Sequence, residues 1–372
     1  MDLERKNSFK KFPPPRKEVE DLKSYSAPVE GRRKLLRLDF NENTIGPSPL
    51  VVQALRNIPA NQIAIYPEYN GLREAMVQNL NTKRPSSNLN SSHIGLFNGV
   101  DGAIHAIFHA YGDRKDQLLT TSPTFGYYKP CAEMQGMKVK AIPYKKKNFL
   151  FPVDEFNAFL IKNKPRICMI CNPNNPTGTR LSPQKIIEWA NRSSNTLFVV
   201  DELYEAFTSD SLLSQLDFTA FPNIVILRSF SKTAGLAGLR IGFAIGNSQV
   251  IERINRVTGP YDINSFAVIA AFQALKDQEY IDTYVKEVLK AKSWMINQLE
   301  NSGAIYHADG GNYLLIWPNR NPQEITKLLK KDGILIRDMQ GKPLIEGSLR
   351  VSIGTTEQMK QFWQVFSKHE IQ

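Results

Sequence analysis

Short apolar runs alternate along the middle of the chain with longer stretches in which apolar residues recur at helical spacing. The short runs are bounded by Gly, Pro, Asn and Ser, a pattern typical of β-strands. They cover residues 92–99, 116–123, 138–144, 166–173, 196–202, 223–230 and 240–246. Helical patterns lie between them over residues 99–112, 122–136 and 182–193. This alternation predicts an α/β fold whose mostly parallel sheet is covered by helices on both faces.

The pattern changes after a long helical stretch over residues 265–303. Beyond it, strand-like and helical segments alternate over a shorter length and end in a helical segment at residues 355–370, which is typical of a small α+β domain. We therefore expect an N-terminal arm over residues 1–45 that joins the smaller domain, a large domain over residues 46–272, and a small C-terminal α+β domain over residues 273–372.

Polar, glycine-bearing or aromatic loops follow five of the predicted strands. In open α/β sheets, ligands bind in the loops at the carboxyl ends of the strands. We therefore expect these loops to form one site. They are residues 100–102, 122–125, 172–177, 201–204 and 229–232.

Lys232 and Asp201 are the candidate reactive groups in these loops. A free lysine, with a pKa of about 10.4, is almost fully protonated at neutral pH, so a nucleophilic lysine must be removed from water. Lys232 follows an apolar strand and has small neighbours, which suits this role, and a solvated surface lysine is the alternative. Asp201 closes another apolar strand, where a carboxylate needs a cationic partner. A helix N-cap or a structural ion pair is the alternative for Asp201.

A candidate phosphate site lies in the same region. Backbone N–H groups at a helix N-terminus, hydroxyl groups and a guanidinium all bind this anion. The turn at residues 99–102, Ser229, Ser231 and Arg240 supply these groups. The glycines between residues 235 and 242 do not fit G-x-G-x-x-G, so no dinucleotide-binding fingerprint is indicated.

The composition excludes several other classes of protein. With 42% hydrophobic and 22% charged residues among 372, the chain is typical of globular proteins. No apolar stretch approaches the ~20 residues of a membrane helix, and the N-terminus lacks the apolar region of a secretory signal. We therefore expect a cytoplasmic protein with no membrane contact.

The net charge and the spacing of two cysteines raise the questions of nucleic-acid binding and metal binding. The formal charge of +11 would fit nucleic-acid binding, but the basic residues are scattered and no zinc-finger, RNP or basic-zipper pattern occurs. Cys168 and Cys171 have C-x-x-C spacing, but they lie in an apolar run without a second ligand pair. We expect these cysteines to pack in the core, and we expect neither a metal nor a nucleic-acid partner.

Seven motifs stand in order between residues 38 and 243, within a resemblance that extends from DLKSY at residues 21–25 to SLRVSIGTTEQ at residues 348–358. They are LDFNENTIGPSP, IYPEYNGLREA, NGVDGAI, PTFGYY, CNPNNPTGT, VVDELYEAF and RSFSKTAGLAGLRIGF. In these motifs the chain resembles the class I/II aminotransferases that depend on pyridoxal phosphate and have the aspartate-aminotransferase fold. More narrowly, it resembles the histidinol-phosphate aminotransferase family. The resemblance implies an enzyme with pyridoxal 5'-phosphate as its cofactor.

The resemblance also implies a role for each residue near the cofactor ring. Lys232 would form the Schiff base with the cofactor and move the proton at the substrate's Cα. Asp201 would pair with the pyridinium nitrogen and keep it protonated, so that the ring withdraws electrons. Phe125 would stack on the ring, and Asn175 and Tyr204 would hydrogen-bond its hydroxyl oxygen.

The same resemblance implies how the cofactor phosphate is held. The expected contacts are the backbone of Val100, Asp101 and Gly102, the hydroxyls of Ser229 and Ser231, and the guanidinium of Arg240. In this family a tyrosine at the position of Tyr66 reaches the phosphate from the partner subunit. The resemblance therefore implies a homodimer with shared active sites.

Three further residues are expected to bind the substrate. Arg350 matches a family arginine that holds the substrate's distal anion or carboxylate. Arg337 matches a second arginine typical of histidinol-phosphate enzymes, and Tyr25 matches an N-terminal tyrosine that closes over the same anion. Two arginines on one phosphate supply charge-assisted hydrogen bonds of about 1.5–3 kcal/mol each. A surface ion pair with Asp338 or Glu346 is the alternative for Arg337.

We therefore expect transfer of the amino group of histidinol phosphate to 2-oxoglutarate, with imidazole-acetol phosphate and glutamate as products, in histidine biosynthesis. Other activities stay open, because one scaffold serves many substrates. These are an aromatic amino-acid aminotransferase and a threonine-phosphate decarboxylase. A non-catalytic protein that binds pyridoxal phosphate or nucleic acid is a more distant alternative.

Overall fold

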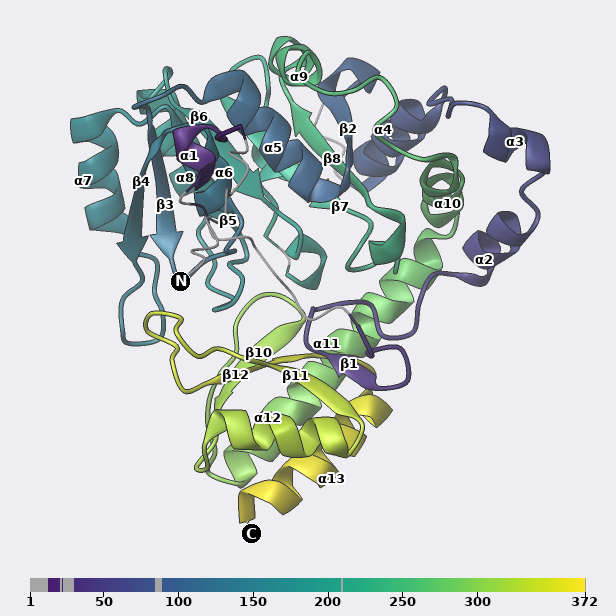
Figure 1. Cartoon of the computed structure of the whole chain (residues 1–372), viewed down its shortest axis with the longest axis vertical. Coiled ribbons are helices and arrows are strands. Elements are labelled where there is room, and N and C mark those ends of the chain that lie inside the picture. Colours follow the sequence, from purple (N-terminus) through teal and green to yellow (C-terminus); the bar gives the residue numbers. More distant parts are fainter. Residues whose placement is uncertain (1–12, 21, 23–29, 84–88, 209, 372) are drawn as a thin grey trace, which may run out of the picture.

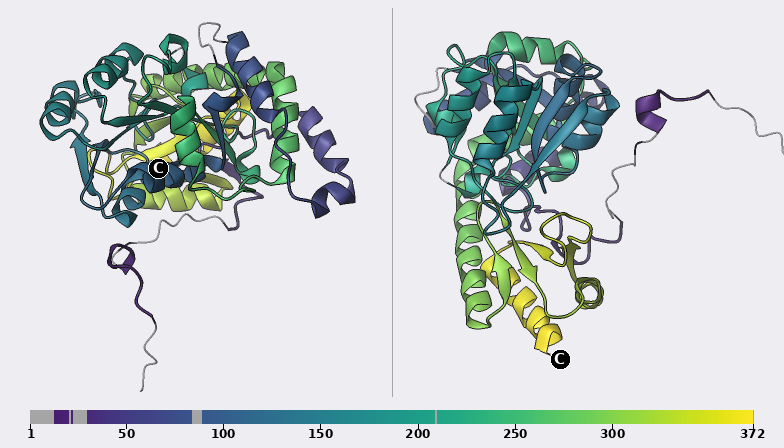
Figure 2. Two further views of the ribbon diagram at one scale, coloured as in Figure 1. Left: turned by 90° about the horizontal axis from the view of Figure 1, so that it is seen from above. Right: turned by 90° about the vertical axis from the view of Figure 1, so that its left-hand side faces the viewer.

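The structure is a computed structural model that describes residues 13–20, 22, 30–83, 89–208 and 210–371. It contains two β-sheets, each covered by helices, and the long helix α11 (Gln278–Asn301) runs from the level of the larger sheet down the side of the smaller one (Figures 1 and 2). Tyr25 lies outside the described residues, so its predicted role stays a prediction.

The larger sheet has seven strands, and each coincides with one of the seven predicted apolar runs. All run parallel except β8, which is antiparallel to its neighbours β2 and β7. In sheet order they are β2 (Ile94–Asn98), β8 (Ile241–Gly246), β7 (Ile224–Ser229), β6 (Leu197–Asp201), β5 (Ile167–Cys171), β3 (Gln117–Ser122) and β4 (Lys138–Pro143). The mostly parallel sheet predicted from the sequence is confirmed.

Alternate residues of these strands point into two cores, one on each face of the larger sheet. In β6, Leu197 and Val199 lie in one core, whereas Phe198 and Val200 lie in the other. The first core is covered by α5 (Gly99–Tyr111), α6 (Tyr128–Met134) and α9 (Ser248–Asn255). The second is covered by α2 (Pro49–Arg56), α4 (Leu72–Lys83), α7 (Val153–Asn163), α8 (Pro183–Arg192) and α10 (Ser265–Lys276). Burial on both faces explains why the strands read as continuous apolar runs.

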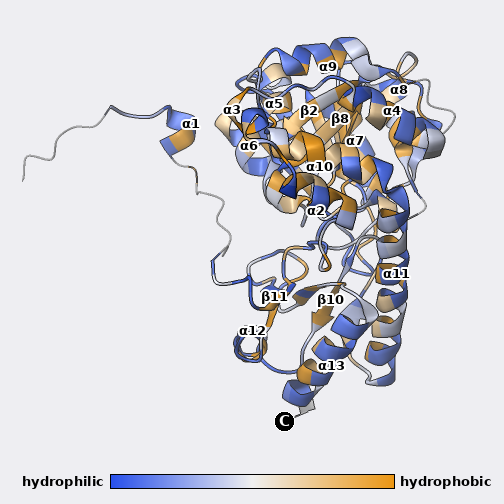
Figure 3. Ribbon diagram, turned by 90° about the vertical axis from the view of Figure 1, so that its right-hand side faces the viewer, coloured by the Kyte–Doolittle hydropathy of each residue, from blue (hydrophilic) through white to orange (hydrophobic). Residues whose placement is uncertain are grey.

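The smaller sheet joins the N-terminal and C-terminal parts of the chain. Its order is β1 (Leu36–Leu38), β11 (Ile334–Asp338), β12 (Leu349–Ser352), β10 (Tyr313–Trp317) and β9 (Ile305–His307). Strand β1 pairs parallel with β11, and the other pairs are antiparallel. Helices α11, α12 (Pro322–Lys331) and α13 (Thr356–Ile371) cover it, and the exposed sides of α11 and α13 are mostly hydrophilic (Figure 3). The predicted domain boundaries stay a prediction.

Polar caps begin several helices. At the start of α8, the Ser182 hydroxyl accepts a hydrogen bond from the Lys185 N–H, and Pro183 occupies the first turn, where its missing N–H carries no penalty. The remaining short helices are α1 (Lys17–Glu20), α3 (Ala60–Ala64) and the 3₁₀ turns η1 (Ser91–His93), η2 (Glu205–Phe207), η3 (Leu212–Gln215) and η4 (Ala237–Leu239). Among the described helices, none combines the length and the apolar character required to cross a membrane.

Candidate active site

A cavity of about 500 Å³ lies between the carboxyl ends of the parallel strands and the smaller sheet. Most of the predicted site residues line it, although they come from distant parts of the sequence. They are Val100, Asp101, Phe125, Asn175, Asp201, Tyr204, Ser229, Ser231, Lys232, Arg240, Arg337 and Arg350. Gly102 lies in the first turn of α5 and does not line the cavity, and Tyr66 lies on the surface.

Lys232 follows the end of β7 and projects into this cavity. Its Nζ atom donates a hydrogen bond to the Phe40 carbonyl oxygen at 2.9 Å. Removal from water, together with the positive charge of Arg350, lowers the pKa of Lys232 to about 8. A larger fraction of this amine than of an exposed lysine is therefore neutral at neutral pH, as a nucleophile or base requires. The alternative of a solvated surface lysine does not fit this position.

Asp201 ends β6 as a buried carboxyl with 2% of its surface exposed. One carboxylate oxygen, Oδ2, accepts a hydrogen bond from the Tyr128 hydroxyl at 2.5 Å, and Oδ1 accepts one from the Leu203 N–H at 3.2 Å. Burial raises the pKa of Asp201 to about 6, and the bond from Tyr128 opposes this rise. Within the described part of the chain, Asp201 forms no salt bridge, so the alternative of a structural ion pair is not supported. A buried carboxylate at the edge of a cavity suits a cationic ligand group.

The opposite end of the cavity carries groups that bind anions. Arg240 Nη2 lies 2.7 Å from Asp101 Oδ2, and the Ser229 hydroxyl donates to that of Ser231 at 2.8 Å. Gly99 has φ +70°, and a Cβ atom there would lie 2.5 Å from Arg240 Nη2. The positive φ and this close approach both favour glycine, beside which the guanidinium lies against the N-terminus of α5, where backbone N–H groups and the helix dipole favour an anion.

Asn175 and Tyr204 also line the cavity and are joined by a hydrogen bond. The Asn175 side-chain amide donates to the Tyr204 hydroxyl at 3.3 Å, and Asn41 donates to the same hydroxyl at 3.0 Å. Arg350 Nη1 donates to Asn175 Oδ1 at 2.7 Å, and its Nη2 donates to the Asp39 carbonyl oxygen at 2.6 Å. Arg350 thereby connects the smaller sheet to the loop that carries Asn175.

Arg337 lies on the next strand of the smaller sheet, opposite Arg350 in the β11–β12 register. Its guanidinium carbon lies 5.7 Å from the centre of the Phe40 ring. Among the described residues, it has no salt bridge to Asp338 or Glu346, so the alternative of a surface ion pair is not supported. Both arginines line the same side of the cavity.

A family model described as aminotransferase class I and II matches residues 33–366. The chain belongs to this family. It is 33% identical to a dihydroxyacetone phosphate transaminase of Campylobacter jejuni over 331 residues, which covers 87% of each protein. It is 30% identical to a histidinol-phosphate aminotransferase of Moorella thermoacetica over 340 residues, which covers 89% of this chain and 84% of the relative.

Solved structures of class I and II aminotransferases have the same architecture. A histidinol-phosphate aminotransferase of Sinorhizobium meliloti, crystallised with pyridoxal-5'-phosphate, matches with a TM-score of 0.84 at 22% identity and covers 97% of this chain and all of its own. An L-threonine-O-3-phosphate decarboxylase of Porphyromonas gingivalis matches with a TM-score of 0.77 at 24% identity, over 91% of this chain and all of its own. An aspartate aminotransferase of Thermus thermophilus matches with a TM-score of 0.78 at 20% identity, over 96% of this chain and all of its own, which confirms the aspartate-aminotransferase fold predicted from the motifs.

The cavity of this aminotransferase fits pyridoxal 5'-phosphate. It offers a lysine with a lowered pKa, a buried carboxylate that can face the pyridinium nitrogen, and an arginine with two serines at a helix N-terminus for the phosphate. These groups match the aldehyde, the ring nitrogen and the phosphate of that cofactor in chemistry. The chain is a pyridoxal-phosphate-dependent transaminase.

Several residues at this site were not predicted from the sequence, and three of them carry ionisable side chains close to the predicted groups. Lys342 and Glu42 also line the cavity, and Glu42 is held by two bonds from Arg32, the shorter of 2.8 Å. Tyr128 lies behind the cavity and contacts Asp201. Lys342 and Glu42 have the appearance of ordinary surface charges in the sequence, and Tyr128 lies in a segment that reads as helix core.

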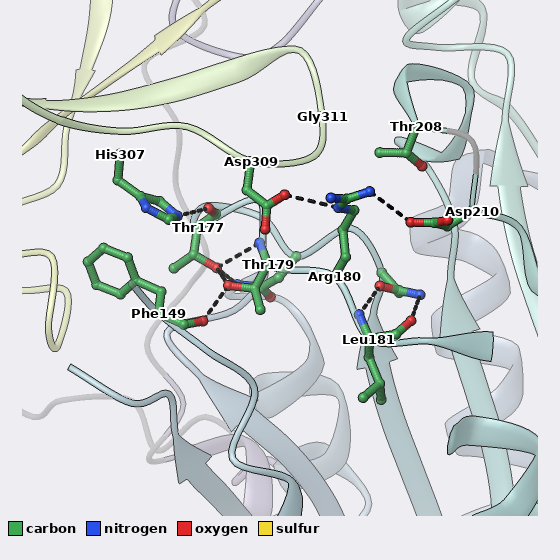
Figure 4. Close-up of polar contacts among 12 residues, drawn as sticks. Phe149, Thr177, Thr179, Arg180, Leu181, Thr208, Asp210, His307, Asp309 and Gly311 are labelled. Atoms are coloured by element: carbon green, nitrogen blue, oxygen red, sulfur yellow. Dashed lines mark hydrogen bonds and ion pairs between the residues drawn. The ribbon is translucent and has the colours of Figure 1, made fainter. Parts of the chain in front are cut away.

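A group of polar contacts ties the loop after β5, which carries Asn175, to the smaller sheet (Figure 4). His307 Nε2 lies 2.9 Å from the Thr177 carbonyl oxygen. Arg180 lies between Asp309 and Asp210, with N–O distances of 2.9 and 2.8 Å. These ion pairs are half-exposed and contribute about 0–1 kcal/mol each, so their main effect is to fix the geometry of the loop.

Proposed function

We propose that this aminotransferase transfers the amino group of histidinol phosphate to 2-oxoglutarate, and that imidazole-acetol phosphate and glutamate are its products. The observation that carries this proposal is the pair of arginines, Arg337 and Arg350, on one side of the cavity that contains Lys232. A lone carboxylate requires one guanidinium, whereas a phosphate group can bind two with charge-assisted hydrogen bonds. Lys342 adds a third positive charge to the same lining.

Each residue of the cavity has a proposed task. Lys232 binds the cofactor, and its neutral Nζ atom then accepts the proton from the Cα atom of the bound amine. Asp201 holds the proton on the ring nitrogen. Bound in this way, the pyridine ring of the cofactor withdraws electrons from Cα and makes that proton acidic enough to leave. Asn175 and Tyr204 orient the ring, and Phe125 packs against its face.

The phosphate of the cofactor has its own set of proposed ligands, at the other end of the cavity. They are the backbone N–H groups of Val100, Asp101 and Gly102, the hydroxyls of Ser229 and Ser231, and the guanidinium of Arg240. Asp101 neutralises one side of Arg240, with 2.7 Å between Nη2 and Oδ2. The two phosphates, of cofactor and substrate, are therefore proposed to bind to different arginines.

The names of the relatives support a phosphate-bearing substrate. They include histidinol-phosphate aminotransferases, a dihydroxyacetone phosphate transaminase and, among solved structures, a threonine-phosphate decarboxylase. The compounds in these names share a phosphate group and differ in the rest of the molecule. The amine that corresponds to dihydroxyacetone phosphate is serinol phosphate, which is therefore a second candidate substrate.

We further propose a homodimer in which Tyr66 reaches the cavity of the partner subunit. In the single chain, 71% of Tyr66 is exposed, and its ring stacks on Tyr261 with 4.1 Å between the ring centres. Ile63 and Ile65, its neighbours, are each 57% exposed. A group of exposed apolar side chains is typical of an interaction surface, and α3 lies at an edge of the molecule where a second subunit can approach (Figure 1).

The amine can be identified in a single turnover. The protein saturated with cofactor is mixed, without any 2-oxo acid, with histidinol phosphate, serinol phosphate, threonine phosphate or phenylalanine, and the change in the cofactor absorption is followed. We expect the fastest change with histidinol phosphate, and release of imidazole-acetol phosphate. A faster change with serinol phosphate would show that serinol phosphate is the substrate in place of histidinol phosphate, and that the substrate still carries a phosphate group. A faster change with phenylalanine would contradict a substrate that carries a phosphate group. Loss of CO₂ from threonine phosphate would contradict transamination of that compound.

A further inference from the structure

We propose that Tyr128 is a positioning residue for Asp201: its hydroxyl group keeps the buried carboxyl ionised and turned toward the cavity. The inference rests on the cofactor role proposed for Asp201. Tyr128 does not line the cavity itself, so it can act only through the residues that it contacts, Asp201 among them.

The geometry singles out Tyr128 from the other hydroxyl groups near the site. Its side chain is fully buried, with 0% exposed, and its hydroxyl donates to Asp201 Oδ2 at 2.5 Å. The second oxygen of Asp201 is bound by the Leu203 N–H, so the two donors together fix the plane of the carboxylate. The preceding Tyr127 turns the other way and contacts His105.

Tyr128 also supports the residue that packs on the cofactor ring. Its ring meets that of Phe125 edge to face, with 5.4 Å between the ring centres. One side chain thus braces Phe125 and Asp201, which face the ring and its nitrogen respectively. Both contacts follow from the start of α6 at Tyr128, three residues after Phe125.

The other titratable groups around Asp201 act in opposite directions. Lys232 lowers its pKa, whereas Asp101 and burial raise it. The Cys171 thiol and the Tyr204 hydroxyl, whose pKa values burial raises, are neutral near pH 7. Tyr128, whose own pKa is raised well above the ordinary value by burial, stays protonated and can always donate. Its loss removes the strongest interaction that opposes the effect of burial on Asp201.

The test uses Tyr128→Phe, with Tyr144→Phe as the matched control. Tyr144 is also buried, with 3% exposed, and its hydroxyl is hydrogen-bonded to Thr121 at 3.0 Å, away from Asp201. Both variants remove one buried hydroxyl. The dissociation constant of pyridoxal phosphate is measured by absorbance titration from pH 5 to pH 9, together with the melting temperature of the cofactor-free protein over the same range.

In the wild type, cofactor affinity should fall as the pH drops through about 6, because the ionised Asp201 is lost. In Tyr128→Phe we expect this midpoint to rise by about one pH unit, because a hydrogen bond to the charged form is gone. Below both midpoints, the dissociation constant should then be about tenfold higher than in the wild type. Tyr144→Phe should keep the wild-type midpoint, whatever its melting temperature.

The melting temperature of the cofactor-free protein, followed against pH, gives an independent test. The folded-state pKa of Asp201 lies above its ordinary value, so the stability linked to it is present at acid pH and is lost as the pH rises through about 6. In Tyr128→Phe this loss should extend to higher pH. An unchanged midpoint in both measurements, with far-UV circular dichroism showing a folded protein, would overturn the role of Tyr128.

Asp201→Asn separates this failure from failure of the proposed function. If Asp201→Asn removes the pH dependence of cofactor affinity but Tyr128→Phe leaves it as in the wild type, Asp201 keeps its role and Tyr128 loses it. If Asp201→Asn changes neither the affinity nor its pH dependence, the cofactor role of Asp201 is wrong, and the inference on Tyr128 is wrong with it.

Discussion

Lys232 and Lys292 both have pKa values lowered to about 8, and burial is the largest cause for each. Their surroundings differ. Lys292 Nζ donates to the Gly311 carbonyl oxygen at 2.9 Å and to that of Asp309, so this lysine holds one turn of backbone in place. Lys232 projects into the cavity instead. A lowered pKa is therefore shared by a structural and a candidate catalytic lysine, and access to the cavity separates them.

Arg337→Ala tests whether the Arg337 side chain binds the phosphate group of the substrate. We expect kcat/KM for histidinol phosphate to fall about 10- to 100-fold, the equivalent of one lost charge-assisted hydrogen bond. The value for phenylalanine should change much less, because it has no distal anion. Arg256→Ala is the control, since Arg256 pairs with Glu252 on the exposed side of α9 and its loss changes the net charge equally. Equal losses of kcat/KM for both substrates would show that Arg337 does not bind the substrate phosphate.

The sequence identifies residues whose motif carries a strong local signal, and it misses those defined by a distant partner. Lys232, Asp201 and Arg240 were predicted because their motifs are specific, and all three line the cavity. Tyr128 was not predicted, because the carboxylate that it contacts lies 73 residues further along the chain. A buried tyrosine beside apolar residues is ordinarily a core residue, so its spacing carries no sign of this contact.

At the scale of elements, two loops from different sheets meet without room for side chains. The Gly310 N–H donates to the Gly178 carbonyl oxygen at 2.9 Å. A Cβ atom on Gly310 would lie 2.6 Å from the Cβ atom of Pro173, and one on Gly178 would lie 2.7 Å from the Gly310 oxygen. The close approach holds the loop that carries Asn175 against the sheet that carries Arg350.

Gly310→Ala should therefore separate the two loops. We expect a loss of stability of about 1–3 kcal/mol from the overlap and a fall in kcat/KM of about 10- to 100-fold, because small displacements of a site have effects of this size. Gly303→Ala is the control. Gly303 has φ +69°, and a Cβ atom there would have no neighbour within 4 Å, so its substitution should lower stability by about 1–2 kcal/mol and leave kcat/KM unchanged. Equal kinetics for both variants would show that the contact does not position the site.

The sequence predicted which segments form strands better than it predicted which strands pair with one another. The seven apolar runs became the seven strands of the larger sheet, because strands buried on both faces have a strong local signal. The pairing of β1 with β11, which brings Leu36 opposite Ile334, joins segments that are far apart in the sequence. The local sequence pattern of a strand does not identify a pairing partner that is distant in the sequence. The expectation that the N-terminal segment joins the smaller domain nevertheless agrees with this pairing.

At the scale of the whole molecule, the proposed dimer accounts for the position of Tyr66, which is exposed and does not line the cavity of its own chain. Tyr25, the tyrosine expected at the substrate anion, lies outside the described residues. The sequence alone gives no partner surface, because the short apolar run at residues 63–66 does not show whether its side chains are exposed or buried.

Mixing two inactive variants tests whether the active sites are shared. Lys232→Ala and Tyr66→Ala are each expected to have little activity alone. After subunit exchange, about half of the dimers are hybrids and each has one intact site, so the mixture should regain about one quarter of the wild-type activity. Each variant incubated alone is the control. If native mass spectrometry shows hybrid dimers but the mixture stays inactive, Tyr66 does not act in the partner's site. A protein that sediments as a monomer would exclude sharing altogether.

The visible absorption of the cofactor on the wild type and on Lys232→Ala tests the central claim most directly. Both proteins are saturated with pyridoxal phosphate, and free cofactor is removed before the spectra are recorded. We predict an absorption band on the wild type that the free cofactor lacks, its loss when histidinol phosphate is added, and its absence from Lys232→Ala. A wild type that never shows this band, or a Lys232→Ala variant that shows it unchanged, would contradict the account.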